Sequence, residues 1–408
     1  MGVGWFLALR FMLEQRVQNA LIVSGVGAGI GIMVFISALI GGLQASLIEK
    51  TTGSQPHVVV APLELEGRPL LGLDGSEAVA YARRIERPVQ RHRTLDEWQR
   101  IEKNVAAVPG VVATVPIAGG AAIAVRGATD RAVAVLGADP DEMDRVIPIR
   151  KKIVRGTYGV NGADVVLGVD LAHDLGIGVG DRLRIKTARQ EGQIFIVRGL
   201  VDMGSASLNA TWVLMSMRNA QTLLDLGGAA TAIYVKVAEL YEAETVARRI
   251  DRVTGLTVKS WMESNAQLLS ALQSQSASTT MIRTFILVTV AISIASVLVV
   301  SVIQRSKEIG ILRAMGVTRF GVLRVFLFQG AIIGALGSAV GSGLGAGLSY
   351  VFMSVARNAD GTPLFPFSTG PELFASAVGI AIGTGIIAAI IPARRASRLD
   401  PAEAIRLG

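Results

Sequence analysis

The sequence contains no cysteine and only three histidines in 408 residues. The absence of cysteine excludes disulfide bonds, thiolate metal sites and cysteine nucleophiles. The histidines His57, His92 and His173 are far apart in the sequence, so their spacing predicts no metal site. Any large domain in this chain must therefore be stabilised by its own hydrophobic core, which a segment of about 240 residues can supply.

Four long apolar stretches contain no charged residue, namely residues 20–43, 284–303, 325–351 and 374–391. An α-helix needs about 20 apolar residues to cross about 30 Å of hydrocarbon. A buried helix of a soluble protein rarely runs that long without a polar face. We therefore predict a membrane protein whose spans form an α-helical bundle of four, in agreement with its hydrophobic content of 51%.

Basic residues are distributed unevenly around these stretches. By the positive-inside rule, the segment 1–19, the loop 304–324 and the tail 392–408 are expected in the cytoplasm. The large segment 44–283 and the short loop 352–373 are then outside. The net charge of +8 is accounted for by this orientation and does not indicate nucleic acid. The inner basic residues are Arg10, Arg16, Arg305, Lys307, Arg313, Arg319, Arg324, Arg394, Arg395, Arg398 and Arg406, whereas the short outer loop has only Arg357.

The outer segment 44–283 has the mixed pattern of an α+β domain. Apolar residues at near-helical spacing over 95–108 predict a helix that ends at Pro109. Leucines on one side of 267–280 predict a helical stalk that continues outward from the second span. The arginine-rich stretch 67–93 fits either a solvated helix face or a site for an anionic partner. Short β-branched runs predict strands at 58–61, 111–116, 121–126 and 231–237.

The inner loop between the second and third spans has a pattern of its own. Charged residues stand at its start, and the apolar residues Ile309, Leu312 and Met315 are followed by Gly316. This pattern predicts a short amphipathic helix at the membrane surface, ended by the glycine.

The segment E-I-G-I-L-R-A-M-G from Glu308 to Gly316, with F-L-F-Q-G-A-I-I-G from Phe326 to Gly334, resembles a known family. It is similar to the permease subunits of lipoprotein-releasing ABC transporters, the LolC/LolE type within the MacB/FtsX-like superfamily. The resemblance implies a MacB-like topology in the bacterial inner membrane, with a large periplasmic α+β domain between spans 1 and 2. Further matching motifs lie at 56–60, 135–140, 153–156, 166–172, 179–181, 261–265 and 392–406, so that nearly the whole chain is covered.

In this family the loop after the second span is a coupling helix that docks on an ATPase subunit. The sequence has no G-x-x-x-x-G-K-[ST] phosphate loop. The chain is therefore expected to be no enzyme and to bind no cofactor, with ATP and Mg held by a separate ATPase, present as a dimer. The implied contact residues are Glu308, Gly310, Ile311, Leu312, Arg313, Ala314, Met315 and Gly316.

The resemblance also implies a cargo and further partners. An energised complex would extract lipoproteins or similar lipidated cargo from the inner membrane. Its acyl chains would lie between the first span, around Phe35, Ile36 and Leu39, and the second span of a partner permease. That partner would be a second copy or a paralogue, and a periplasmic carrier or adaptor protein and membrane lipids complete the expected partners.

Three other functions fit parts of the same sequence. A MacB-like exporter would work with a periplasmic adaptor to expel drugs, peptides or glycolipids. An FtsX-like regulator would transmit motion to a cell-wall hydrolase, although its outer domain is usually much smaller than about 240 residues. A membrane receptor or scaffold without any ATPase is opposed only by the coupling-helix motif.

Two features near the C-terminus leave their roles open. The third stretch contains glycines at small-x-x-x-small spacing, which permits close helix packing and also suits sliding or tilting of a rigid bundle. Arg394, Arg395 and Arg398 follow the fourth stretch and fit contact with anionic lipid headgroups or with the ATPase. The third-stretch glycines are Gly330, Gly334, Gly337, Gly341, Gly343, Gly345 and Gly347.

Overall fold

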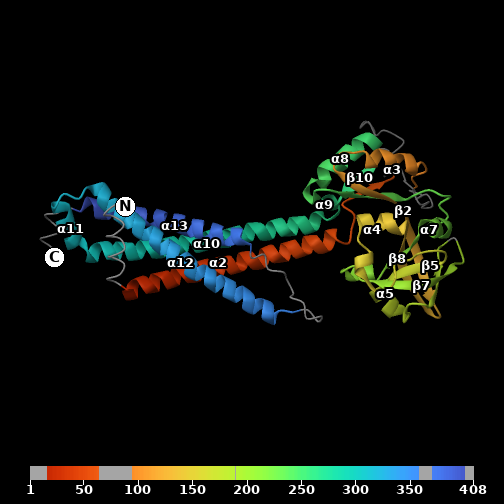
Figure 1. Ribbon diagram of the computed structural model, residues 1–408, viewed down its shortest axis with the longest axis horizontal. Coiled ribbons are helices and arrows are strands. Elements are labelled where there is room, and N and C mark those ends of the chain that lie inside the picture. The colour runs from red at the N-terminus through yellow and green to blue at the C-terminus, as the bar shows by residue number, and fades with distance from the viewer. Residues whose placement is uncertain (1–15, 64–93, 189, 358–369, 400–408) are drawn as a thin grey trace, which may run out of the picture. The chain divides into compact units, whose positions relative to one another are not determined.

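The computed structural model describes residues 16–63, 94–188, 190–357 and 370–399 (Figure 1). The chain divides into two compact units. The first, here called the membrane unit, comprises Met1–Leu47 and Ser270–Gly408, and the second, the outer unit, comprises Ile48–Leu269. The arginine-rich stretch 67–93 lies outside the described residues.

The membrane unit contains four helices long and apolar enough to cross a membrane. Each of the four predicted spans lies within one of them, so the four-span architecture is confirmed. α10 starts well before the second predicted span, and residues 267–280 are helical as predicted. The helices are α2 (Arg16–Thr52), α10 (Ala266–Gln304), α12 (Arg319–Val355) and α13 (Pro371–Arg398).

α12 packs against α13 through glycine. A Cβ atom built on Gly334 would lie 2.5 Å from the carbonyl oxygen of Ala381. Gly330 and Gly385 approach each other so closely that a Cβ on either would overlap the backbone of the other. Backbone contact of this kind is how helices gain packing energy in lipid, where apolar burial gives no net drive to associate.

The following turns of α12, on the same face of the helix, pack against α2 in the same way. A Cβ on Gly341 would lie 2.7 Å from the carbonyl oxygen of Gly27, and one on Gly345 would lie 2.9 Å from that of Gly31. Gly337 faces the side chain of Val26. α12 therefore contacts two helices through successive segments of one glycine stripe, and tight packing of the third span is confirmed.

The outer unit has two lobes, and the first is formed by the two ends of its sequence. Its elements follow the order β-α-β-β-α-β, and its antiparallel sheet has the strand order β10-β1-β9-β2. The two helices pack on this sheet over a buried core that includes Val105, Ile250 and Trp261. The elements are β1 (Val58–Ala61), α3 (Trp98–Ala106), β2 (Val111–Arg126), β9 (Ala232–Val237), α8 (Ala243–Thr254) and β10 (Thr257–Ser260).

The second lobe is inserted between β2 and β9. Its strands form a mixed sheet in which β3 pairs with β8, and β5 with β7, in parallel. Its core includes Leu167, Leu183 and Phe195. The elements are β3 (Thr129–Ala138), α4 (Pro140–Val146), β4 (Ile153–Gly156), β5 (Asp164–Gly168), α5 (Val169–Leu175), β6 (Arg182–Lys186), β7 (Gln193–Val201), α6 (Ala206–Asn209), β8 (Trp212–Ser216) and α7 (Met217–Leu223).

Two local predictions in the outer unit need correction. The runs 111–116 and 121–126 are not separate strands, because β2 continues through both and exchanges β9 for β3 as its partner near Ala118. The glycines between the runs stay extended, and the Gly119 N–H donates to Thr231 Oγ1 at 2.8 Å. The helix expected over 95–108 is shorter, since Leu95 instead pairs with Ala230 in a β-bridge.

His57 and Trp261 connect the first strand of the outer unit with its last elements. The Val237 N–H donates to His57 Nδ1 at 3.3 Å, and the Trp261 N–H donates to the His57 carbonyl oxygen at 2.9 Å. The Trp261 indole donates to the Leu240 carbonyl oxygen at 2.9 Å. Burial lowers the pKa of His57, so the imidazole is kept neutral and free to accept at Nδ1.

The glycine packing predicts a contrast between two positions on α12. Gly334→Leu should lower the stability of the bundle by about 1–3 kcal/mol or more, because the new side chain meets the α13 backbone. Gly343→Leu is the matched control, since a Cβ there meets no atom within 4 Å. Thermal unfolding of the full-length protein in detergent measures both, and equal stability of the two variants would contradict the packing.

The His57 contacts predict a pH dependence of the outer unit. The pKa of His57 is lower in the folded protein than in the unfolded protein, so the neutral imidazole stabilises the fold above the ordinary pKa of about 6.5. This stabilisation is lost as the pH falls through the pKa of the folded protein. His57→Asn keeps an acceptor near the position of Nδ1 and does not titrate, so its β1 and β9 amides should keep more of their protection on acidification. Hydrogen exchange of the full-length protein at about pH 7.5 and about pH 5.5 measures this. An identical loss of protection in both proteins would exclude His57 as the cause.

Candidate functional site

The loop between α10 and α12 forms the predicted short helix. This helix, α11 (Ser306–Ala314), is separated from α10 by one residue, Arg305. It ends because Gly316 has a φ of +97°, a left-handed conformation that glycine adopts without strain. The Gly316 N–H donates to the Arg313 carbonyl oxygen and the Val317 N–H to that of Leu312, each at 3.1 Å. These two bonds satisfy carbonyl groups that the end of a helix would otherwise leave unpaired.

One face of α11 is packed into the membrane unit. Ile309 is 1% exposed and belongs to the bundle core, and Leu312 packs beside Val325 of α12. The guanidinium of Arg313 donates from Nη1 to the carbonyl oxygen of Leu399, which follows α13. α11 is thus attached by side chains to both α12 and the end of α13.

Arg305 lies beneath this helix rather than in solvent. Its side chain is 6% exposed and its guanidinium lies 3.4 Å from the carboxylate of Glu308, whose side chain is 55% exposed. This contact gives the buried cation a carboxylate partner across the turn between α10 and α11. From the sequence, Arg305 was counted only among the orienting charges.

The opposite face of α11 is exposed. Met315 is 78% and Ile311 44% exposed, and Ala314 and Gly316 beside them are also exposed. The predicted apolar stripe is therefore divided, since Ile309 and Leu312 point into the bundle and only Met315 points out. The physical reason is that Met315 follows Ile311 by four residues and its N–H donates to the Ile311 carbonyl oxygen at 2.9 Å, so Met315 lies on the exposed face of Ile311. Three of the eight predicted contact residues are buried or half-buried against the rest of the membrane unit, namely Gly310, Leu312 and Arg313. Their role in docking stays a prediction.

A further exposed aromatic residue was missed in the sequence. Phe320, in the first turn of α12, is 57% exposed, and the guanidinium carbon of Arg324 lies 4.3 Å from its ring centre. Thr318 caps the helix by accepting from the Gly321 N–H at 3.1 Å. An aromatic residue followed four positions later by arginine was the available signal. Ile311, Met315 and Phe320 together are called the foot.

The predicted cargo residues lie on the membrane part of α2. Phe35, Ile36 and Leu39 are all half-buried. The Phe35 ring packs edge-on against Phe352 of α12, with 6.1 Å between the ring centres. Phe35 therefore has a packing role within this chain, and cargo contact by the three residues stays a prediction.

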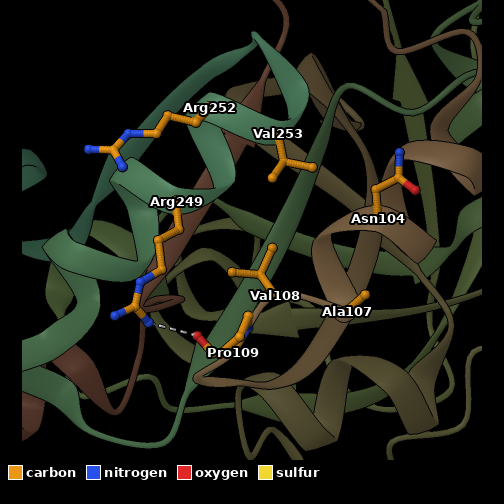
Figure 2. Close-up of a pocket in the computed structure, with 7 residues that line it drawn as sticks. All are labelled: Asn104, Ala107, Val108, Pro109, Arg249, Arg252 and Val253. Atoms are coloured by element: carbon orange, nitrogen blue, oxygen red, sulfur yellow. Dashed lines mark hydrogen bonds between the residues drawn. The ribbon is translucent and has the colours of Figure 1, made fainter.

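The outer unit offers a groove of about 580 Å³ between α3 and α8 (Figure 2). The end of α3 and the turn after it contribute mainly apolar residues, including Val108, and α8 contributes Arg249, Arg252 and Val253. Arg249 donates from Nη1 to the Pro109 carbonyl oxygen at 3.2 Å. Neither arginine forms an ion pair with a carboxylate among the described residues. The groove suits an acidic, partly apolar segment, and arginines three positions apart on a helix were the signal for it in the sequence.

Metal chemistry finds no support in the geometry of the described ranges. Among residues 16–63, 94–188, 190–357 and 370–399, no group of three or more His, Cys, Asp or Glu side chains is placed to hold a metal ion. What the described site offers is a packed helix with an exposed apolar foot, which is an arrangement for contact with another protein.

Two family models match the chain. The MacB-like periplasmic core domain matches residues 19–253, more than half of the chain, and the FtsX-like permease C-terminal domain matches residues 280–401. The second match contains α11, the foot and the glycine stripe of α12.

Curated relatives match over most of their length. The lipoprotein-releasing system transmembrane protein LolC of Neisseria meningitidis is 23% identical over 94% of this chain and 92% of its own. LolC of Xylella fastidiosa (strain 9a5c) is 23% identical over 98% of both. The macrolide export ATP-binding/permease protein MacB of Rhodopseudomonas palustris is 34% identical, but over only 29% of this chain and 17% of its own.

Solved structures give weaker matches. The periplasmic region of MacB from Actinobacillus actinomycetemcomitans covers 54% of this chain at 12% identity, with 95% of that structure covered and a TM-score of 0.35. The extracellular domain of the transporter YknZ covers 41% of this chain at 14% identity, with 89% of that structure covered and a TM-score of 0.31. The family models and the full-length relatives, rather than these structures, decide the assignment. The chain belongs to the MacB/FtsX-like family of ABC transporter permeases and is of the LolC type within it.

Proposed function

We propose that this chain is the permease subunit of an ABC transporter that extracts lipoproteins or similarly lipidated cargo from the bacterial inner membrane. ATP hydrolysis by a separate subunit drives the extraction. The observation that carries the proposal is the end-to-end match to LolC, which includes both the outer unit and the membrane unit. The exposed foot supports it, because a driven permease needs a surface on which the motor can act.

The foot is the contact with the ATPase in this proposal. Ile311 and Met315 enter an apolar recess of the ATPase, and Glu308 fixes the register of the contact through its charge. A force on α11 then reaches α12 and α13, because Ile309, Leu312 and Arg313 attach the helix to them. α10 begins at Ala266 and ends one residue before Arg305, so motion at the loop is passed along one continuous helix.

Cargo entry is lateral rather than through a polar channel. The four predicted spans contain no charged residue, whereas paths for ions or polar solutes usually require intramembrane charge. An acyl chain needs no such path, since hydrocarbon can enter from the bilayer between helices. The exposed residues Met281, Phe285, Val288 and Ile292 repeat along α10 at the spacing of a helix-packing stripe, and this stripe faces the partner permease across the cargo site.

Both termini and the foot lie in the cytoplasm in this proposal, and the outer unit lies in the periplasm. The complex contains an ATPase dimer and a second permease, either another copy or a paralogue. ATP and Mg are held by the ATPase subunits. The groove between α3 and α8 is available to the periplasmic carrier or adaptor.

A MacB-like exporter is the second candidate function, favoured by the partial matches to MacB. The two are separated by extraction in mild detergent followed by identification of the bound subunits. A lipidated protein and a second permease support release, whereas a periplasmic adaptor joined to an outer-membrane duct supports export. Both functions would be excluded if no ATPase were bound to the extracted chain and the purified chain hydrolysed ATP alone.

A charge at the foot should uncouple the complex. Met315→Asp places a carboxylate on the apolar contact surface, so we expect normal membrane insertion and a loss of cargo release of about tenfold or more per ATP hydrolysed. Met315→Leu keeps an apolar side chain of similar size and should release cargo normally. Release and ATP hydrolysis measured together in proteoliposomes test this, and unaltered release by the Asp variant would remove the foot from the mechanism.

The glycine that ends α11 gives an independent prediction. Gly316→Pro cannot adopt a φ of +97° and loses the N–H that bonds to Arg313, so the end of α11 must rearrange. Gly316→Asn tolerates the left-handed conformation better and should retain most of the coupling. The ratio of release to hydrolysis, compared for the two variants, measures the effect, and equal ratios would mean that the end of α11 is not part of the coupling surface.

A further inference from the structure

A cavity of about 240 Å³ lies in the membrane unit where α10 ends, beside the start of α11 and the end of α13. It belongs to none of the surfaces described above, since the foot is on the outward face of α11. Its lining residues are Val299, Val302, Ile303, Ser306, Pro392, Arg395 and Leu399.

The walls of this cavity are apolar. Val299, Val302 and Ile303 supply one side from α10, and Pro392 and Leu399 supply the other. Ile303 is 66% exposed, so the cavity opens toward the surface of the bundle that meets lipid in a membrane. Hydrocarbon fits such walls, whereas water would find few hydrogen-bond partners there.

One end of the cavity is cationic and polar. Arg395 forms no ion pair with any carboxylate in the described part of the chain. Ser306 contributes a hydroxyl group and is also the first residue of α11, where main-chain N–H groups add partial positive charge. No acidic residue lines the cavity. An anion is therefore the matching partner at this end.

We propose that this cavity binds an anionic phospholipid, with the phosphate at Arg395 and Ser306 and an acyl chain along Val299, Val302 and Ile303. The occupant follows from the combination of walls and charge, because a phospholipid carries hydrocarbon and an anion in one molecule. Basic pockets between membrane helices on the cytoplasmic side are known to favour such headgroups. The inference rests on the proposed orientation, which places this end of the bundle in the cytoplasmic leaflet.

The bound lipid connects three elements. It touches the end of α10, the first residue of α11 and the end of α13, which are also the elements through which motion of the foot is transmitted. An occupied cavity therefore braces α11 against α13. The lipid therefore belongs to the part of the structure that transmits motion from the foot. It is distinct from the cargo, whose predicted contacts are on α2.

Native mass spectrometry of the full-length chain in detergent tests the proposal. Added phosphatidylglycerol should be retained more strongly than phosphatidylcholine of the same chain length. Arg395→Gln should lower phosphatidylglycerol retention about fivefold, the effect of one basic residue at a membrane surface. Arg394→Gln is the matched control, because this neighbouring arginine is equally exposed and does not line the cavity.

A second pair of variants tests the acyl-chain wall. Val299→Trp fills the cavity and should lower phosphatidylglycerol retention, whereas Val300→Trp, on the adjacent and exposed position, should leave it unchanged. Equal retention of the two lipids, equal effects of the two arginine variants, or displacement of the lipid by inorganic phosphate would each overturn the proposal. These measurements need neither ATPase nor cargo, so they can fail while the proposed transport function stands.

Discussion

Backbone contact at glycine is the interaction on which the membrane unit depends. In lipid the apolar surface of a helix gains little by meeting another apolar surface, so close packing must hold the bundle together. Gly334 and Gly341 bring α12 against α13 and α2 respectively, at distances that leave no room for a side chain. α12 thus packs against two other helices of the bundle, and these contacts fix the positions of the elements that are attached to it.

The loop between α10 and α12 illustrates this dependence on packing within the bundle. α11 is only nine residues long and would be marginal as an isolated helix. Ile309 and Arg313 attach it to the bundle, the latter through the Leu399 carbonyl oxygen beyond α13. Because these contacts face inward, Met315 and Ile311 are left exposed without loss of order. A contact surface that is rigid and exposed is suited to transmit a push, and the proposed bracing lipid lies between the same elements.

The sequence predicted the larger features well, because they rest on strong local signals. Absence of charge over about 20 residues identified the four spans, and glycine with the charge pattern identified α11 and its end. Finer features depend on tertiary contacts that no local pattern encodes. The continuity of β2 past Gly119 requires two different partner strands, and the burial of Arg305 and Ile309 requires the bundle. Phe320 was missed because it lies just outside the loop motif.

The central claim is that the foot contacts a separate ATPase in the cytoplasm. The chain has no native cysteine, so Met315→Cys provides a single thiol for cross-linking in inside-out vesicles that contain the co-expressed ATPase. The account predicts an adduct between this thiol and the ATPase, and none from Val253→Cys in the outer groove. Absence of the adduct, together with modification of the Met315→Cys thiol by a membrane-impermeant reagent in intact spheroplasts, would contradict it.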